Sequence, residues 1–173
     1  MADGGLSQTM ESFTPGPETA KTFRNALGRF ATGVTVVTAR TPQGPIGITA
    51  NSFASVSLDP PLVLWSPAKA SKRYEAFIAA EDFAIHVLGE DQMELCQTFA
   101  RPDHSFDGLD WADCADGVPL LAGCLARFEC RRHAVFDGGD HSIIVGRVKR
   151  AALREGEPLL FSSGQFGHFA PGH

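Results

Sequence analysis

The feature that most constrains the fold is a pair of long strand-like segments joined by a glycine turn. Segments 124–137 and 140–153 flank Gly138 and Gly139. Along the first segment small or apolar residues alternate with charged ones, as in a strand with one buried face. Glycine adopts the positive φ of a tight turn without steric cost. The pattern predicts a long β-hairpin, and with it an antiparallel sheet.

The rest of the chain adds more strands than helices. Five further segments are rich in β-branched and aromatic residues or alternate with period two. They are 34–38, 47–58, 62–66, 82–88 and 158–163. Three segments have helical spacing, and in the first of them Phe23, Leu27 and Phe30 lie on one stripe. They are 18–32, 71–81 and 90–100. Without regular strand–helix–strand alternation, the order predicts a mainly β protein, an antiparallel barrel with peripheral helices.

The length of 173 residues suits one domain. The first 17 residues are rich in Gly, Ser, Thr and Pro, which predicts a flexible tail. We therefore expect a tail at 1–17, a folded domain at 18–166 and a short C-terminal tail at 167–173.

Charge and cysteine use limit the partners and the compartment. The net charge is −5 with acids and bases interspersed, which argues against a large nucleic-acid surface. No apolar run approaches the ~20 residues that span a bilayer. The N-terminus has no signal-peptide pattern, and the four cysteines are spaced too widely for a familiar zinc motif. We expect reduced cysteines, no metal and a cytoplasmic protein.

Common motifs for nucleotide binding and hydrolysis are not found in the sequence. It has neither the Rossmann nor the P-loop glycine pattern, and neither a nucleophile elbow nor a zinc-protease motif. A Ser-His-Asp triad stays open, because its members meet only in space.

Segment 47–63, GITANSFASVSLDPPLV, is unusually neutral. From Thr49 to Ser57 five of nine side chains are hydroxyl or amide groups, and no charge appears before Asp59. If the segment is one strand with side chains alternating between two faces, both faces carry mostly small residues. Such a surface suits a flat heteroaromatic ligand with hydrogen-bonding edges. The alternative is an edge strand whose Ser and Thr face water.

Four blocks of the sequence carry a family resemblance. GVTVVTA (33–39), GITANSFASVSLDPPLVL (47–64), FAIHVLGEDQ (83–92) and GGDHSIIVGRV (138–148) resemble the flavin reductase family. The resemblance implies an FMN-binding split β-barrel, a homodimer with flavin near the subunit interface, and use of NADH or NADPH. It also implies a partner monooxygenase that receives reduced flavin by diffusion.

The resemblance implies a set of flavin contacts. The ring system would meet the first three blocks, and the ribityl chain or phosphate would meet the two serines of the second. The residues are Thr35, Val36, Val37, Thr49, Ala50, Asn51, Ser52, Ser55, Phe83, Ala84 and Ile85. His86 stands where many relatives have asparagine, and a packing role is the more common one for such a histidine.

Two further groups complete the expected site. In GGDH, Asp140 could bond His141, which the resemblance associates with the nicotinamide; the alternative is plain turn chemistry with an exposed histidine. His133 is a competing histidine on a solvated face. For the flavin phosphate the candidates lie in SPAKASKR, where Ser71 could start a helix. They are Ser66, Lys69, Lys72 and Arg73, with Arg101 as a weaker one and a merely solvated basic turn as the alternative.

These patterns lead to one main hypothesis and two rivals. The main one is an NAD(P)H-dependent flavin reductase that transfers hydride from nicotinamide to FMN or FAD and supplies a monooxygenase. One rival keeps a permanently bound flavin. The other is a flavin- or haem-binding split-barrel protein without turnover.

Overall fold

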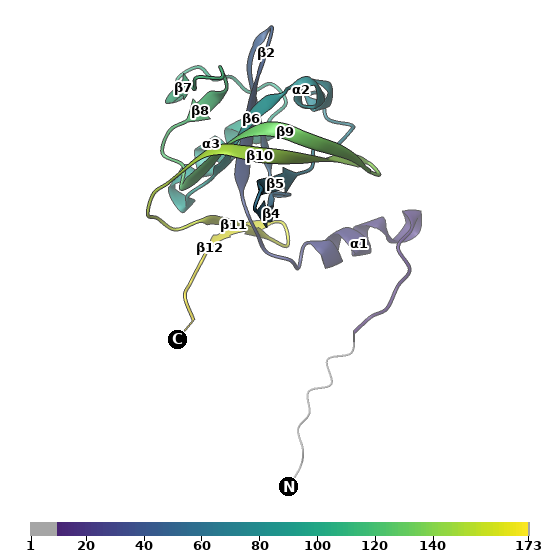
Figure 1. Ribbon diagram of the computed structural model, residues 1–173. Coiled ribbons are helices and arrows are strands. Elements are labelled where there is room, and N and C mark those ends of the chain that lie inside the picture. Colours follow the sequence, from purple (N-terminus) through teal and green to yellow (C-terminus); the bar gives the residue numbers. More distant parts are fainter. Residues whose placement is uncertain (1–9, 173) are drawn as a thin grey trace.

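A computed structural model describes residues 10–172, and its main feature is a seven-stranded antiparallel sheet (Figure 1). The strand order is β3-β2-β6-β9-β10-β5-β4. These strands are β2 (Thr35–Thr41), β3 (Gly44–Ala50), β4 (Ala54–Leu58), β5 (Pro61–Trp65), β6 (Asp82–Val87), β9 (Ala126–Gly138) and β10 (His141–Leu153).

Two small sheets and three α-helices surround it. One small sheet has the order β1-β11-β12 and the other pairs β7 with β8. Their strands are β1 (Thr32–Gly33), β7 (Trp111–Asp113), β8 (Pro119–Leu121), β11 (Leu159–Ser162) and β12 (Gln165–His168). The helices are α1 (Ala20–Leu27), α2 (Tyr74–Ala79) and α3 (Met93–Ala100), with 3₁₀ turns η1 (Pro17–Thr19) and η2 (Glu90–Gln92).

The long hairpin predicted from the sequence is confirmed. β9 and β10 pair from Gly138 opposite His141 to Ala126 opposite Leu153. Gly139 has a φ of +79°, which the turn requires. The tip of this hairpin projects beyond the rest of the sheet (Figure 1).

The neutral segment is two strands rather than one, which corrects the single-strand prediction. β3 ends at Ala50 and β4 begins at Ala54, and these strands form opposite edges of the seven-stranded sheet. A flat sheet of that width would separate its edges by about 29 Å at 4.8 Å per strand. The connection 51–53 reaches at most about 14 Å. The sheet must therefore curl until its edges approach, which yields a barrel that is not closed by strand pairing.

The core lies on both faces of β2. Val37 packs in a cluster with Trp65 and Phe83, whereas Val36 packs in a second cluster with Leu88 and Phe99. β2 also has hydrogen-bonded neighbours on both sides, β3 and β6. No surface of the central part of β2 is left for a ligand.

The helices are shorter than their sequence patterns. α1 ends at Leu27 with Gly28 as its C-cap, because the chain must extend for Thr32 to pair with β11. Segment 90–100 divides into η2 and α3, with Phe99 buried as expected. α2 begins after Arg73, so Ser71 does not cap it; its Oγ accepts the Arg73 N–H at 3.2 Å.

The C-terminal end differs from the expected tail. β12 pairs with β11 through residue 168, so the last strand crosses the expected boundary at 166. Ser163 and Gly164 form the two-residue turn of this hairpin, both with positive φ. Residues 1–9 of the expected N-terminal tail lie outside the described part. Within residues 10–172, no helix is long and apolar enough to cross a membrane. All four cysteines are free thiols, as expected.

Candidate functional site

The end of β3 and the turn after it line a small cavity. Thr49, Ala50 and Asn51 meet there with Val34 and the C-terminal hairpin, and the cavity has a volume of about 180 Å³. Thr49 Oγ1 donates to the Cys96 carbonyl at 2.6 Å, which fixes its side chain against α3. Asn51 is exposed and free to contact a ligand. The remaining lining residues are Phe161 and Phe166.

Ser52 connects this turn to the start of the basic segment. Its Oγ accepts a hydrogen bond from the Ser66 N–H at 2.9 Å. The residues after Ser66 pair with the first residues of β10, since the Ser142 N–H donates to the Pro67 carbonyl at 3.1 Å and Ala68 bridges to His141. The Ser52 side chain thus contacts the Ser66 backbone, and the segment that follows Ser66 pairs through its backbone with His141 and Ser142.

His141 is held by its neighbour, as the sequence suggested. Its Nδ1 lies 2.7 Å from Asp140 Oδ1, and its side chain is 44% exposed. The hydrogen bond from His141 holds the pKa of Asp140 below its usual value. With Nδ1–H donated to Asp140, Nε2 is the ring nitrogen left to accept a hydrogen bond.

A lysine contact fixes the basic segment to the hairpin tip. The Lys69 ammonium pairs with the Asp137 carboxylate, and this hydrogen bond raises the pKa of Lys69. The Lys69 N–H also donates to the Asp140 carbonyl at 2.9 Å. The Lys69 ammonium is therefore already paired within the protein, whereas Lys72 is exposed.

Six residues expected to contact the ring system have side chains that are buried in the folded chain. All are at most 3% exposed. β2 and β6 are inner strands of the curled sheet, so their side chains fill the core and support the site from behind. The six are Thr35, Val36, Val37, Phe83, Ala84 and Ile85. Thr35 does reach the site indirectly, because its Oγ1 donates to the Ala50 carbonyl at 2.7 Å.

Arg73 also has a structural role where a phosphate contact was expected. Its Nη1 donates to the carbonyls of Gly47 and Phe99, both at 2.9 Å. It also reaches the Arg101 carbonyl at 3.1 Å. Partial burial lowers the pKa of Arg73. The guanidinium therefore clamps β3 to the end of α3, and Ser66 and Lys72 remain as phosphate candidates.

His86 is a packing residue, which agrees with the favoured interpretation. Its ring is fully buried, Nδ1 lies 3.0 Å from the Val36 carbonyl, and Nε2 accepts the Leu121 N–H at 3.1 Å. Burial lowers its pKa to about 4. The imidazole is neutral and bonded at both nitrogens, with no route to a substrate.

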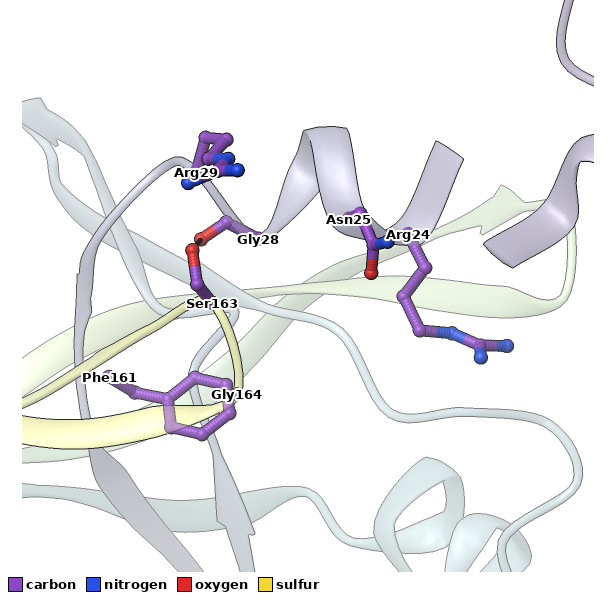
Figure 2. A pocket seen from close by; sticks show the side chains of 7 residues that line it. All are labelled: Arg24, Asn25, Gly28, Arg29, Phe161, Ser163 and Gly164. Atoms are coloured by element: carbon purple, nitrogen blue, oxygen red, sulfur yellow. Dashed lines mark hydrogen bonds between the residues drawn. The ribbon is translucent and has the colours of Figure 1, made fainter. Parts of the chain in front are cut away.

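A further cavity, which no sequence motif indicated, is formed by α1 and the C-terminal hairpin. This cavity of about 410 Å³ lies between α1 and the β11–β12 hairpin, and Figure 2 shows its lining. Phe161 lines this cavity as well as the small one. The hairpin was expected to be a strand followed by a tail, and no motif in it indicated a ligand. Within residues 10–172, no group of three or more metal-binding side chains occurs.

Comparison with known proteins gives a consistent result. Residues 27–170 match the family model for the flavin reductase like domain. The FMN reductase (NADH) SmoA of Agrobacterium fabrum is 64% identical over 158 residues, covering 91% of each chain. The flavin-dependent monooxygenase reductase subunit HsaB of Rhodococcus jostii is 42% identical over 86% of this chain and 77% of its own.

A solved structure extends the comparison to the fold. The Streptomyces globisporus NADH:FAD oxidoreductase SgcE6 in complex with NAD and FAD fragments superposes with a TM-score of 0.84 at 42% identity. The match covers 92% of this chain and 98% of that one. The curled antiparallel sheet, the four sequence blocks and these matches agree, and the chain belongs to the flavin reductase family.

Proposed function

We propose that this protein is an NADH-dependent flavin reductase that transfers hydride from the nicotinamide to FMN or FAD. The observation that carries the proposal is the continuous connection from the neutral turn at Asn51, through the Ser52–Ser66 contact, to His141. It links a turn suited to a flat ring to a histidine that hydrogen-bonds a carboxylate. The FMN and NADH named for SmoA support the choice of substrates.

The residues present fit a flavin ring. An isoalloxazine needs apolar contact for its faces and neutral hydrogen-bonding groups for its edge. The small cavity offers both, with the rings of Phe161 and Phe166 and the exposed amide of Asn51. Ser55 is exposed on β4, and its proposed contact is the ribityl chain; the proposed phosphate contacts are Ser66 and the exposed Lys72.

The protein's task in this reaction is to position the reactants. Bound flavin supplies the electron-accepting chemistry. Correct placement of two reactants can contribute about 7–11 kcal/mol toward lowering the barrier. We assign His141 Nε2 to orient the nicotinamide, with Asp140 holding the ring. Asn51 and Ser52 hold the flavin edge, and the buried β2 and β6 side chains keep this surface rigid.

The active form is proposed to be a homodimer. Phe23, Leu27 and Phe30 are 42%, 59% and 79% exposed, although they form one apolar stripe on and just after α1. Such a stripe marks a protein–protein contact. We propose that a second copy of the chain packs against this stripe, as the family resemblance implies. Reduced flavin would then leave by diffusion to a monooxygenase; the relative HsaB is named as the reductase subunit of a flavin-dependent monooxygenase.

An absorbance assay tests the proposed activity. Purified protein is mixed with NADH and free FMN or FAD, and NADH oxidation is followed at 340 nm. We expect oxidation that depends on added flavin. Oxidation without added flavin would indicate a permanently bound one. Flavin binding without NADH oxidation would contradict the reductase and favour a passive flavin carrier.

A further inference from the structure

We propose that the cavity between α1 and the β11–β12 hairpin binds the adenosine phosphate half of a dinucleotide. This inference rests on the proposed function and adds a second subsite to it. The cavity, here called the α1 cavity, is lined by Arg24, Asn25, Gly28, Arg29, Phe161, Ser163 and Gly164. Its volume of about 410 Å³ is within the range of roughly 300–1,000 Å³ for small-molecule sites.

The orientation of α1 is the first argument. The helix presents Arg24 and Asn25 to the cavity, while Phe23 and Leu27 do not line it; all four residues are exposed in the single chain. Figure 2 shows the Arg24 and Asn25 side chains extending from α1 toward the side on which Phe161 lies. A helix held only for chain packing would turn its apolar stripe to the protein. Here the polar side faces the protein and lines a cavity.

The charge at this cavity is the second argument. Arg24 and Arg29 both line it, and among residues 10–172 neither forms an ion pair. Figure 2 shows the Arg24 and Arg29 side chains at different ends of the cavity, so each guanidinium offers a separate positive group on a chain of net charge −5. Arginine binds phosphate through two parallel hydrogen bonds, which makes a phosphorylated ligand the best match.

The anchoring of α1 is the third argument. The Ser163 N–H donates to the Gly28 carbonyl at 2.8 Å, so the helix end is fixed on the turn of the hairpin. Ser163 adopts a φ of +50°, an unusual conformation for a residue other than glycine. This contact holds Arg24 and Asn25 at a defined position relative to the Phe161 ring.

An aromatic ring connects the two cavities. Phe161 lines the α1 cavity and also the small cavity that contains Thr49, Ala50 and Asn51. Aromatic rings stack on nucleobases with little preference for sequence, and the Asn25 amide can bond a base edge. A dinucleotide can therefore place its reacting ring at Asn51 and its adenosine phosphate at α1. FAD and NADH share this half, and the experiment separates them.

Direct binding of ADP tests the subsite without catalysis. Isothermal titration calorimetry is carried out with the full chain and its Arg24→Gln and Arg29→Gln variants, with Arg147→Gln as control. Arg147 is exposed on β10 and lines neither of the two cavities. Its substitution by Gln removes one positive charge, as the two cavity substitutions do. Loss of a charge-assisted contact predicts roughly 10-fold weaker ADP binding for at least one cavity variant. Equal affinity in all four proteins overturns the subsite, even if the reductase activity is confirmed.

Substrate pairs then identify the source of the adenosine phosphate. The KM values of FMN, FAD, NADH and reduced nicotinamide mononucleotide are compared for the wild type and Arg24→Gln. If Arg24→Gln raises the KM of FAD but not that of FMN, the subsite binds the adenosine phosphate of the flavin. If the substitution raises the KM of NADH but not that of reduced nicotinamide mononucleotide, the subsite binds the adenosine phosphate of the nicotinamide substrate. An equal rise for all four substrates contradicts the proposal, because it indicates a general defect. Failure of the wild type to oxidise NADH would overturn the function but leave the ADP result interpretable.

Discussion

Two of the histidines, His141 and His86, have opposite environments. His141 is partly exposed beside Asp140, while His86 is fully buried between two backbone groups. The sequence favoured these roles for both histidines, because GGDH is a turn followed by a strand and FAIHVL is a buried strand. It could not give the partners of His86, since Leu121 lies on β8, 35 residues away.

Substitution of His141 tests its role in orienting the nicotinamide. We expect His141→Ala to lower kcat/KM for NADH roughly 10-fold or more, with the Kd for flavin unchanged, because the lost contact is to the nicotinamide. Asp140→Asn should give a smaller loss in the same direction. His133→Ala, an exposed histidine on β9, is the control. Unchanged kcat/KM in His141→Ala would exclude the assigned role.

The buried His86 predicts a pH-dependent stability. Its pKa is about 4 in the folded chain and about 6.5 when unfolded, so protons bind the unfolded state first as the pH falls. The contribution of His86 to the free energy of unfolding is complete above pH 6.5. It falls by roughly 3 kcal/mol as the pH is lowered to 4 and below. We expect the Tm of the wild type to fall over this range more steeply than that of His86→Asn. Parallel Tm profiles would show that His86 is not the cause.

For the strands and helices, local sequence patterns predicted where most strands lie but not which strands pair with each other in the sheet. The β9–β10 hairpin was predictable because its turn and alternation are contained in one segment. The break at 51–53 was not, because Thr49 to Ser57 alternates as if it were one strand. The alternation of a single strand therefore does not continue across that break: Ala50 packs against the core at the end of β3, and β4 begins at Ala54 on the opposite edge of the sheet. Burial of β2 and β6 likewise depends on strand order, which no local pattern contains.

Packing between β10 and β6 gives a stability prediction at this scale. A Cβ at Gly146 would lie 2.6 Å from Phe83 Cζ and 3.0 Å from Cys130 Cβ. We expect Gly146→Ala to lower the free energy of unfolding by about 1–3 kcal/mol. Gly167→Ala on β12 is the matched control, because nothing lies within 4 Å of its Cβ position. Chemical denaturation of both variants measures the difference, and equal stability would show that the core at Gly146 can accommodate a methyl group.

At the scale of the whole molecule, α1 is the element least explained by a single chain. It buries none of its residues, and it lies to one side of the sheet (Figure 1). The sequence predicted the apolar stripe of this helix but could not show what faces it. A stripe that is exposed in the folded chain is the structural reason to expect a second copy.

A charged residue in this stripe tests the dimer. We expect Leu27→Asp to shift the molar mass in light scattering from that of a dimer to that of a monomer, because it places a charge in an apolar contact. Leu153→Asp is the control, since Leu153 is 83% exposed at the far end of β10. A wild-type protein that is already monomeric would refute the proposed assembly.

The most direct test of the central claim is the affinity for FMN of a variant at the turn between β3 and β4. FMN fluorescence quenching is measured for the wild type, for Asn51→Trp, and for Leu153→Trp as an exposed control. We expect Asn51→Trp, by filling the small cavity, to weaken FMN binding at least about 10-fold, whereas the control should bind FMN as the wild type does. Undiminished FMN binding by a folded Asn51→Trp protein would contradict the placement of the flavin.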